Sequence, residues 1–343
     1  MTAPEVPSRA PAEHADDDAI LPFEIAALDL RGRVVRLGPA VDAILGRHGY
    51  PPPLSKLLGE AIVLTALLGS SLKFEGRFIL QTSTDGPVRM IVVDYRSPGS
   101  MRACAQFDEQ RVRDLAVNST GKSTSTSPAM VDLLGRGHLA MTIDQGPDMS
   151  RYQGLVALEG GSLEDAAHAY FARSEQIPTK VRLAVAEEIV AGDDGAHHRW
   201  RAGGMLLQFL PKKAERMRGA DLDPGDAPQG TAVDEVPQDD AWVEGQSLIA
   251  TVEDLELIDP DLSSELLLFR LFHEHGVRVF NASGVEAKCS CSRQSVTGML
   301  KSFSKEDRDD MIQDGVIAVT CEFCNTRYVF SPAEVEAAGP DAS

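Results

Sequence analysis

The sequence predicts an α+β protein with three parts: a mixed N-terminal core domain, a helical linker and a small C-terminal zinc-binding domain. Three observations support this division. Strand and helix patterns are mixed without regular alternation over residues 20–211. An acidic stretch with several prolines and glycines and no basic residue follows between Gly219 and Asp240. Four of the five cysteines lie beyond residue 285.

The composition is that of an ordinary soluble protein with an acidic surface. Hydrophobic residues make up 43% of the 343 residues, and the formal net charge is -19. This charge disfavours nucleic acid and anionic membranes as partners. Residues 1–19 are acidic and proline-rich without the apolar core of a signal peptide, and no apolar run is long enough to span a membrane. We therefore expect a disordered acidic tail at 1–19 and a cytoplasmic location.

A long apolar helix is predicted within the core domain, residues 20–211. Pro51–Pro53 fit only before or within a first helical turn, and apolar residues then recur at three- and four-residue spacing to about Leu72. Strands are expected before it at 23–30 and 34–37, joined by a turn at Arg31–Gly32. The elements expected after it are a hairpin of strands 78–82 and 88–95 around Asp85–Gly86, strands at 101–107, 138–143, 152–158 and 180–186, and a helix at 163–173.

The linker is predicted in two pieces. Residues 212–241 form a flexible acidic segment whose like charges repel one another. Residues 242–284 form a helical segment, with amphipathic helices from about Trp242 to Leu257 and from about Leu262 to Glu274. Helices of this length are not stable alone in water, so each is expected to dock on another part of the protein.

The cysteines beyond residue 285 form two close pairs, Cys289 with Cys291 and Cys321 with Cys324. Two pairs separated by a loop of this size are typical of a four-thiolate zinc site, which leaves no coordination position open for a substrate. The predicted zinc domain spans 285–334, with a short tail at 335–343. Members of each pair are close enough in sequence to form a local disulfide on oxidation. The fifth cysteine, Cys104, is expected to be a small buried hydrophobe in a strand.

Alternatives to a switchable zinc site remain open at this stage. The module could be an inert structural zinc ribbon, although its near-balanced charge disfavours a nucleic-acid-binding ribbon. The Cys321–Cys324 pair could also belong to a thioredoxin-like oxidoreductase, although such enzymes lack a second cysteine pair that completes a zinc site.

Motifs along most of the chain resemble the redox-regulated 33 kDa chaperonin family, also called the heat-shock protein 33 family. The C-terminal motifs are KCSCSRQSVTGML and VTCEFCNTRYVFSPAEV. The resemblance leaves out the N-terminal tail and the acidic linker, which is longer than expected for the family. The motifs in the core are Tyr50–Gln81, Arg151–Gly160, Tyr170–Thr179 and Ala202–Pro211.

The resemblance implies an ATP-independent holdase chaperone without catalytic turnover. In the reduced state it implies a dormant monomer in which Cys289, Cys291, Cys321 and Cys324 hold one Zn²⁺. On oxidation it implies zinc release, two disulfides, an unfolded linker and a protein, often dimeric, that binds unfolding client proteins. By the spacing of the cysteines, the expected disulfides are Cys289–Cys291 and Cys321–Cys324.

The docked linker helices suggest a cover over the client-binding surface. Undocking them would expose apolar surface on both the helices and the core, as a client-binding protein requires. The alternative is that these side chains form the core of a rigid helical subdomain. The residues predicted to form the cover are Trp242, Leu248, Val252, Leu255, Leu266 and Phe269.

Overall fold

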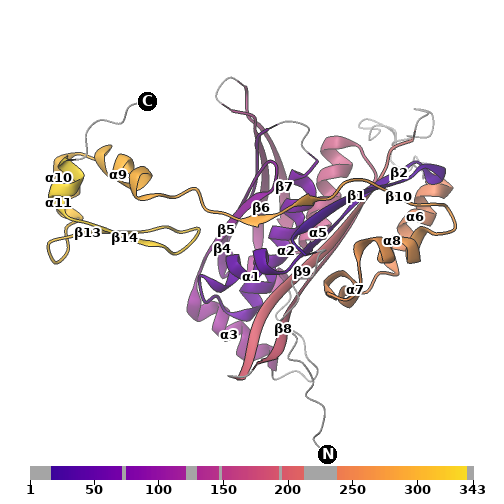
Figure 1. The fold of residues 1–343 in the computed structure, drawn as a ribbon, viewed down its shortest axis with the longest axis horizontal. Helices are drawn as coiled ribbons and strands as arrows, with labels where there is room; N and C mark the ends of the chain where they lie inside the picture. The colour runs from indigo at the N-terminus through magenta and orange to yellow at the C-terminus, as the bar shows by residue number, and fades with distance from the viewer. Residues whose placement is uncertain are drawn as a thin grey trace, which may run out of the picture.

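The computed structural model describes residues 17–71, 75–120, 130–146, 149–192, 195–211 and 238–337. Nearly all of the predicted acidic tail and most of the flexible acidic linker, residues 212–237, lie outside the described residues. Figure 1 shows a central body of strands and helices, three linker helices on one side of it, and a small C-terminal module on the other. The predicted α+β class with a helical linker and a cysteine-bearing C-terminal module is confirmed.

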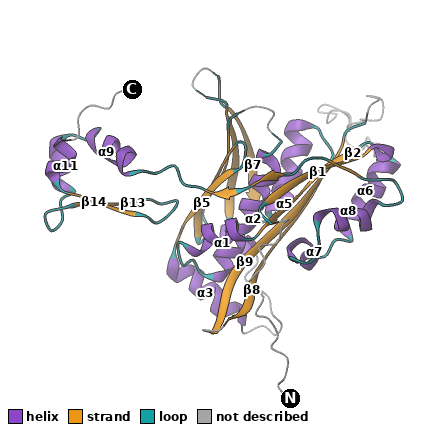
Figure 2. Ribbon diagram, viewed as in Figure 1, coloured by secondary structure: helices purple, strands orange, loops and turns teal. Residues whose placement is uncertain are grey.

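Two six-stranded sheets form the central body (Figures 1 and 2). The first sheet has the order β10-β1-β2-β9-β8, with β11 also paired to β1, and the second has the order β12-β5-β4-β3-β6-β7. The strands of the first sheet are β1 Ala19–Ile25, β2 Leu30–Leu37, β8 Thr179–Gly192, β9 Gly195–Phe209, β10 Arg278–Val279 and β11 Ser283–Gly284. Those of the second are β3 Arg77–Thr84, β4 Val88–Arg96, β5 Ser100–Phe107, β6 Arg136–Asp144, β7 Tyr152–Glu159 and β12 Glu286–Ala287.

Helix α2, Pro52–Gly69, lies between the two sheets and organises the main core. Its N-terminal prolines occupy the first turn, where their missing N–H groups leave no hydrogen bond unmade. The expectation that no apolar run reaches the length of a membrane span is wrong for this helix. It is long and apolar enough to cross a membrane by length and composition alone, but its side chains are largely buried by the sheets. The other core helices are α1 Pro39–Gly46, α3 Glu109–Thr120, α4 Met130–Leu134 and α5 Leu163–Tyr170, which continues into a π-turn at Phe171–Glu175.

The linker helices cover the outer face of the first sheet. They are α6 Asp240–Ala250, α7 Asp254–Ile258 and α8 Ser264–Phe272. A second apolar cluster joins them to β1, β2 and β9. In that cluster the Trp242 ring stacks on Phe209 with centroids 6.3 Å apart, and Phe272 lies 6.0 Å from Phe23.

The C-terminal module consists of α9 Arg293–Lys301, α10 Lys305–Asp310, the hairpin of β13 Ile317–Thr320 and β14 Arg327–Phe330, and α11 Pro332–Ala337. It has its own small core, which contains Val296, Leu300, Ile317, Phe330 and Val335. A five-residue core buries little surface, so packing alone contributes little to the stability of this module.

Several predicted boundaries are wrong in detail. The first two strands are joined by a turn at Ala26–Leu28 and not at Arg31–Gly32. Asp29, the next residue after this turn, adopts a positive φ of 52°. Gly32 lies inside β2, paired with Phe23 of β1, and a Cβ at this position would meet the Phe23 ring at 2.3 Å. The predicted helix 242–257 is two helices, α6 and α7. Helix α11 extends the last module to Ala337, within the predicted tail.

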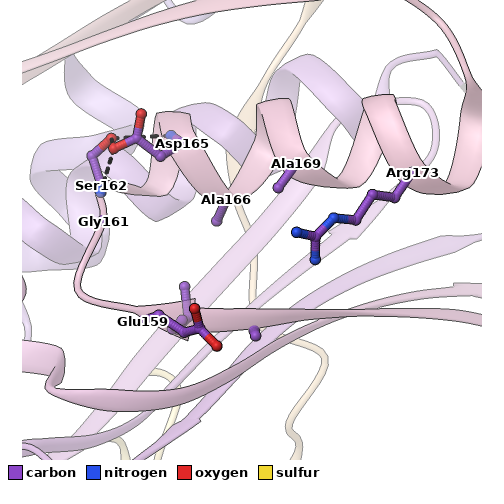
Figure 3. A pocket seen from close by; sticks show the side chains of 9 residues that line it. Glu159, Gly161, Ser162, Asp165, Ala166, Ala169 and Arg173 are labelled. Carbon is purple, nitrogen blue, oxygen red and sulfur yellow. Dashed lines mark hydrogen bonds between the residues drawn. The ribbon is translucent and has the colours of Figure 1, made fainter. Parts of the chain in front are cut away.

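A cavity lies between β7 and α5, away from the cysteine cluster. Figure 3 shows Glu159 and Arg173 extending toward it from the strand and from the helical turn. Ser162 and Asp165 at its rim hydrogen-bond each other as a capping box at the start of α5. Its lining contains no cysteine or histidine.

Candidate metal centre

Cys289 and Cys291 are held between a core-bound strand and a capped helix. The strand β12 pairs in parallel with β5, and the backbone N–H of Lys288 donates to the Met101 carbonyl at 2.9 Å. Immediately after Cys291, Ser292 caps α9 by accepting from the Ser295 N–H at 3.0 Å. The first cysteine pair is therefore attached directly to the edge of the core sheet.

Cys321 and Cys324 lie in the tight turn between β13 and β14. The Cys321 N–H donates to the Thr326 carbonyl at 3.0 Å, and the Asn325 N–H donates to the Cys321 carbonyl at 2.8 Å. Asn325 adopts a φ of 56°, a left-handed conformation that asparagine tolerates better than most residues. This turn directs both sulfurs toward the first pair.

The four sulfurs converge to within 4.8 Å of one another. Cys289 Sγ lies 3.7 Å from Cys321 Sγ, and Cys291 Sγ lies 3.3 Å from Cys324 Sγ. Four thiolates about 2.3 Å from a tetrahedral Zn²⁺ would be about 3.8 Å apart, so the spacing and the donor set fit a four-thiolate metal site. The four cysteines predicted as ligands are brought together and could hold a metal ion.

The surroundings shift the pKa values of Cys291 and Cys324 in opposite directions. Burial, together with the neighbouring sulfurs, raises the pKa of Cys291 to about 12. Burial also acts to raise the pKa of Cys324, but hydrogen bonds involving Thr326 and the sulfurs of Cys291 and Cys321 outweigh it and lower that pKa to about 6. A bound divalent cation would favour the thiolate form of all four sulfurs, because its positive charge offsets their mutual repulsion.

Besides Thr326, whose Oγ1 lies 3.2 Å from Cys324 Sγ, two side chains outside the cysteine motif contact the sulfurs. Tyr328 Oη on β14 lies 3.2 Å from Cys291 Sγ. Arg102 on β5 donates to Ser290 Oγ at 2.9 Å and approaches Cys289 Sγ at 4.0 Å, while Asp94 holds its guanidinium at 2.8 Å. Neither residue has a spacing in the sequence that relates it to the cysteines, so the sequence alone does not predict its place at the site.

The second cysteine turn also touches the core domain. The Arg102 guanidinium lies 4.2 Å from the centroid of the Phe323 ring, a cation–π contact. The Phe323 carbonyl lies 3.2 Å from His48 Nε2, and Asn325 Nδ2 donates to the Arg47 carbonyl at 3.0 Å. The module is therefore docked on the core through the same turn that carries two of the sulfurs.

The six predicted cover residues divide between two faces of the linker. Trp242 and Val252 are buried against the first sheet, and Leu248 packs at the edge of the same cluster. Leu255, Leu266 and Phe269 are 70%, 55% and 59% exposed, so their side chains do not cover the core. Their place on the docked face is taken by Ile249, Leu257, Leu267, Leu268, Leu271 and Phe272. Cys104 is buried in β5, as predicted.

Comparisons with known proteins agree with this architecture. The family described as Hsp33 protein matches residues 18–331. A 33 kDa chaperonin of Caulobacter vibrioides (strain NA1000 / CB15N) is 45% identical over 94% of this chain and 98% of its own length. A 33 kDa chaperonin of Pseudomonas fluorescens (strain SBW25) is 33% identical, over 93% of each chain. In fold, the chain is similar to the crystal structure of a 33 kDa chaperonin from Thermotoga maritima, with a TM-score of 0.69 and 23% identity over 93% of this chain and 97% of that one. The family match and these relatives, together with the cysteine cluster in the expected place, lead to one conclusion: the chain belongs to the Hsp33 family of chaperonins.

Proposed function

We propose that this chain is a redox-regulated, ATP-independent holdase chaperone. In the reduced state the four cysteines hold one Zn²⁺, and the linker helices stay docked on the first sheet. Oxidation pairs Cys289 with Cys291 and Cys321 with Cys324, the metal leaves, and the linker undocks. The exposed apolar surface then binds unfolding proteins.

The observation that carries the proposal is the covalent and hydrogen-bonded path between the sulfurs and the linker. The chain passes from α8 through β10 and β11, which pair with β1, and through β12, which pairs with β5, directly to Cys289. A change in the fold of the module therefore acts on the last residues of a segment that lies on both sheets. The linker is held mainly by an apolar cluster that can be uncovered.

The cysteines themselves supply the switch. Bound metal would hold the four sulfurs as thiolates and fix the two halves of the module together. Each disulfide forms when two thiolates lose two electrons, and one molecule of peroxide takes up these electrons and two protons from the solvent to give two molecules of water. Two disulfides leave no thiolate to act as a ligand. The small core of the module is then insufficient to keep it folded.

The remaining parts of the proposal follow from the family membership and the acidic composition. The reduced protein is a monomer in the cytoplasm, and the oxidised protein forms a homodimer. Its partners are unfolding client proteins, neither nucleic acid nor a membrane, and it carries out no catalytic turnover.

The test follows metal, thiols and chaperone activity together. Purified zinc-loaded protein is treated with peroxide at elevated temperature, and zinc release, free thiols and suppression of a client's aggregation are measured over time. We expect all three to change together, and peptide mapping should recover the two local disulfides. The Cys289→Ser, Cys321→Ser double variant should lose the coupling, with Cys104→Ser as the matched control that keeps it.

The other functions predict different results. A constitutive zinc-ribbon adaptor would gain no anti-aggregation activity on oxidation. A thiol–disulfide oxidoreductase would catalytically reduce an added disulfide through Cys321 and Cys324. If the double variant still switches normally with oxidant, these cysteines are not the sensor.

A further inference from the structure

Three arginines lie under α7 on the face of the first sheet that the linker covers. The pairing register places Arg36 of β2 opposite Gly203 of β9, and Arg201 lies two residues before that glycine. Arg182 of β8 pairs opposite Met205, two residues after it. Because side chains two residues apart, and directly opposite across strands, share one face of a sheet, the three arginines surround Gly203 on the linker side.

Each arginine forms hydrogen bonds or an ion pair with oxygens of the linker. Arg36, only 2% exposed, donates to the carbonyls of Glu256 and Asp259 at 2.7 Å each. Arg201, 8% exposed, donates to the Ile258 carbonyl at 2.8 Å and also to the Asp17 carboxylate. Arg182 forms an ion pair with the Asp254 carboxylate at 2.9 Å.

An apolar side chain of the linker also packs closely on the sheet at this site. Leu257 is fully buried among the apolar residues of the sheet, and its carbonyl would lie 2.0 Å from a Cβ at position 203. Glycine at this position lets α7 lie directly on the strand. In the docked state this site therefore holds an apolar residue, Leu257, with carbonyl and carboxylate oxygens of the linker on either side of it.

We propose that this arginine site becomes a binding surface for client segments that combine apolar with acidic residues. The inference rests on the proposed function, because it requires the linker to leave. Without α7 the three guanidiniums keep their charge at every physiological pH and lose the linker oxygens that now pair with them. Carboxylates next to apolar residues are the groups that best replace those oxygens.

The charge of the linker supports this occupant. Between Gln238 and His275 the chain has ten acidic residues and one arginine, Arg270. The segment that covers the arginine site thus combines acidic and apolar residues, as the proposed client segments do. A client must compete with that segment, so sequences that resemble it should bind best.

The experiment uses the oxidised, metal-free full chain and two labelled peptides. One is residues 251–262, TVEDLELIDPDL, and the other has Gln for every Glu and Asn for every Asp, with the apolar residues unchanged. Fluorescence anisotropy at low salt should give tighter binding of the acidic peptide by about tenfold, and this preference should disappear at high salt. The reduced, zinc-loaded chain should bind neither peptide, because α7 occupies the site.

Variants assign the preference to this face. Arg182→Gln, the most exposed of the three arginines, should reduce the preference about threefold, whereas Arg31→Gln on the same sheet, an exposed arginine that contacts Glu24, should leave it unchanged. Equal loss in both variants, or in neither, overturns the assignment. Equal binding of both peptides by an oxidised wild type that suppresses aggregation overturns this inference and leaves the proposed function standing. An oxidised protein that binds neither peptide and suppresses no aggregation contradicts the proposed function itself.

Discussion

Glu60 lies on α2 in a position where the folded protein disfavours its charge. Burial, with smaller contributions from the carboxylates of Glu164 and Asp254, raises the pKa of Glu60 to about 7 from an ordinary value of 4.5. Between these two values the unfolded chain has lost this proton and the folded chain keeps it. The contribution of Glu60 to stability therefore falls as the pH rises from about 4.5 to about 7.

Replacing this carboxyl should make the core less sensitive to pH. In Glu60→Gln the free energy of unfolding should exceed that of the wild type by up to about 3 kcal/mol at pH 8, with almost no difference at pH 4.5. Denaturant unfolding at both pH values measures this. The exposed Glu75→Gln is the control and should follow the wild type at both. A stabilisation that is the same at pH 4.5 and 8 would exclude ionisation as its cause.

Tyr328 is a supporting residue of the cysteine cluster, since its hydroxyl lies 3.2 Å from Cys291 Sγ. Hydrogen bonds to metal ligands orient them and tune their affinity. We expect Tyr328→Phe to lower the zinc affinity about tenfold while all four ligands remain. Competition with a chromophoric chelator checks this, with the exposed Tyr152→Phe on β7 as the control. Unchanged affinity would mean that the contact is incidental.

At the scale of single elements, the sequence predicts a helix or strand best where one face of the element is buried. The helix α2 and the hairpin of β3 and β4 are found close to where the apolar spacing and the Asp85–Gly86 turn predict them. The cysteine spacing likewise identified the cluster, because the thiol chemistry of such sites depends on few residues.

The docked face of α8 could not be predicted from the sequence. Its residues Leu266 to Phe269 are apolar in succession, so a helical period selects no single face. The sheet decides instead, burying Leu267 and Leu268 and leaving Leu266 and Phe269 exposed. The sequence does not predict α7 as a separate helix, because its position depends on the arginines beneath it, which lie far away in sequence.

The close approach of the backbone at Gly203 makes the docking of α7 sensitive to a substitution at this position. A methyl group at this position would meet the Leu257 carbonyl at 2.0 Å, and that contact is with backbone that cannot rotate away. In the reduced, zinc-loaded protein, Gly203→Ala should undock α7 and raise hydrogen exchange at residues 254–259 at least tenfold. Gly46→Ala is the control, because a Cβ there meets no neighbour within 4 Å. Unchanged protection of α7 would show that the strand yields instead.

At the scale of the whole molecule, metal removal should unfold the C-terminal module while the core domain stays folded. Bound zinc contributes on the order of 10–16 kcal/mol in small modules of this kind, far more than a five-residue core can. A strong chelator under reducing conditions should therefore abolish hydrogen-exchange protection in α9 and in the β13–β14 hairpin. Protection of α2 and of the two sheets should remain. A module that stays protected without metal would contradict the proposed switch.

Residues 278–288 cross the rims of both sheets in one extended run. Val279 and Ser283 pair with β1, and Glu286 and Ala287 pair with β5, so this one short segment covers one edge of each sheet. Removing this segment would expose two rows of backbone N–H and C=O groups at once. Unpaired strand edges of this kind readily pair with a further strand. Detachment of residues 278–288 would thus leave the core with two unpaired strand edges, on β1 and β5, next to the apolar face that the linker uncovers.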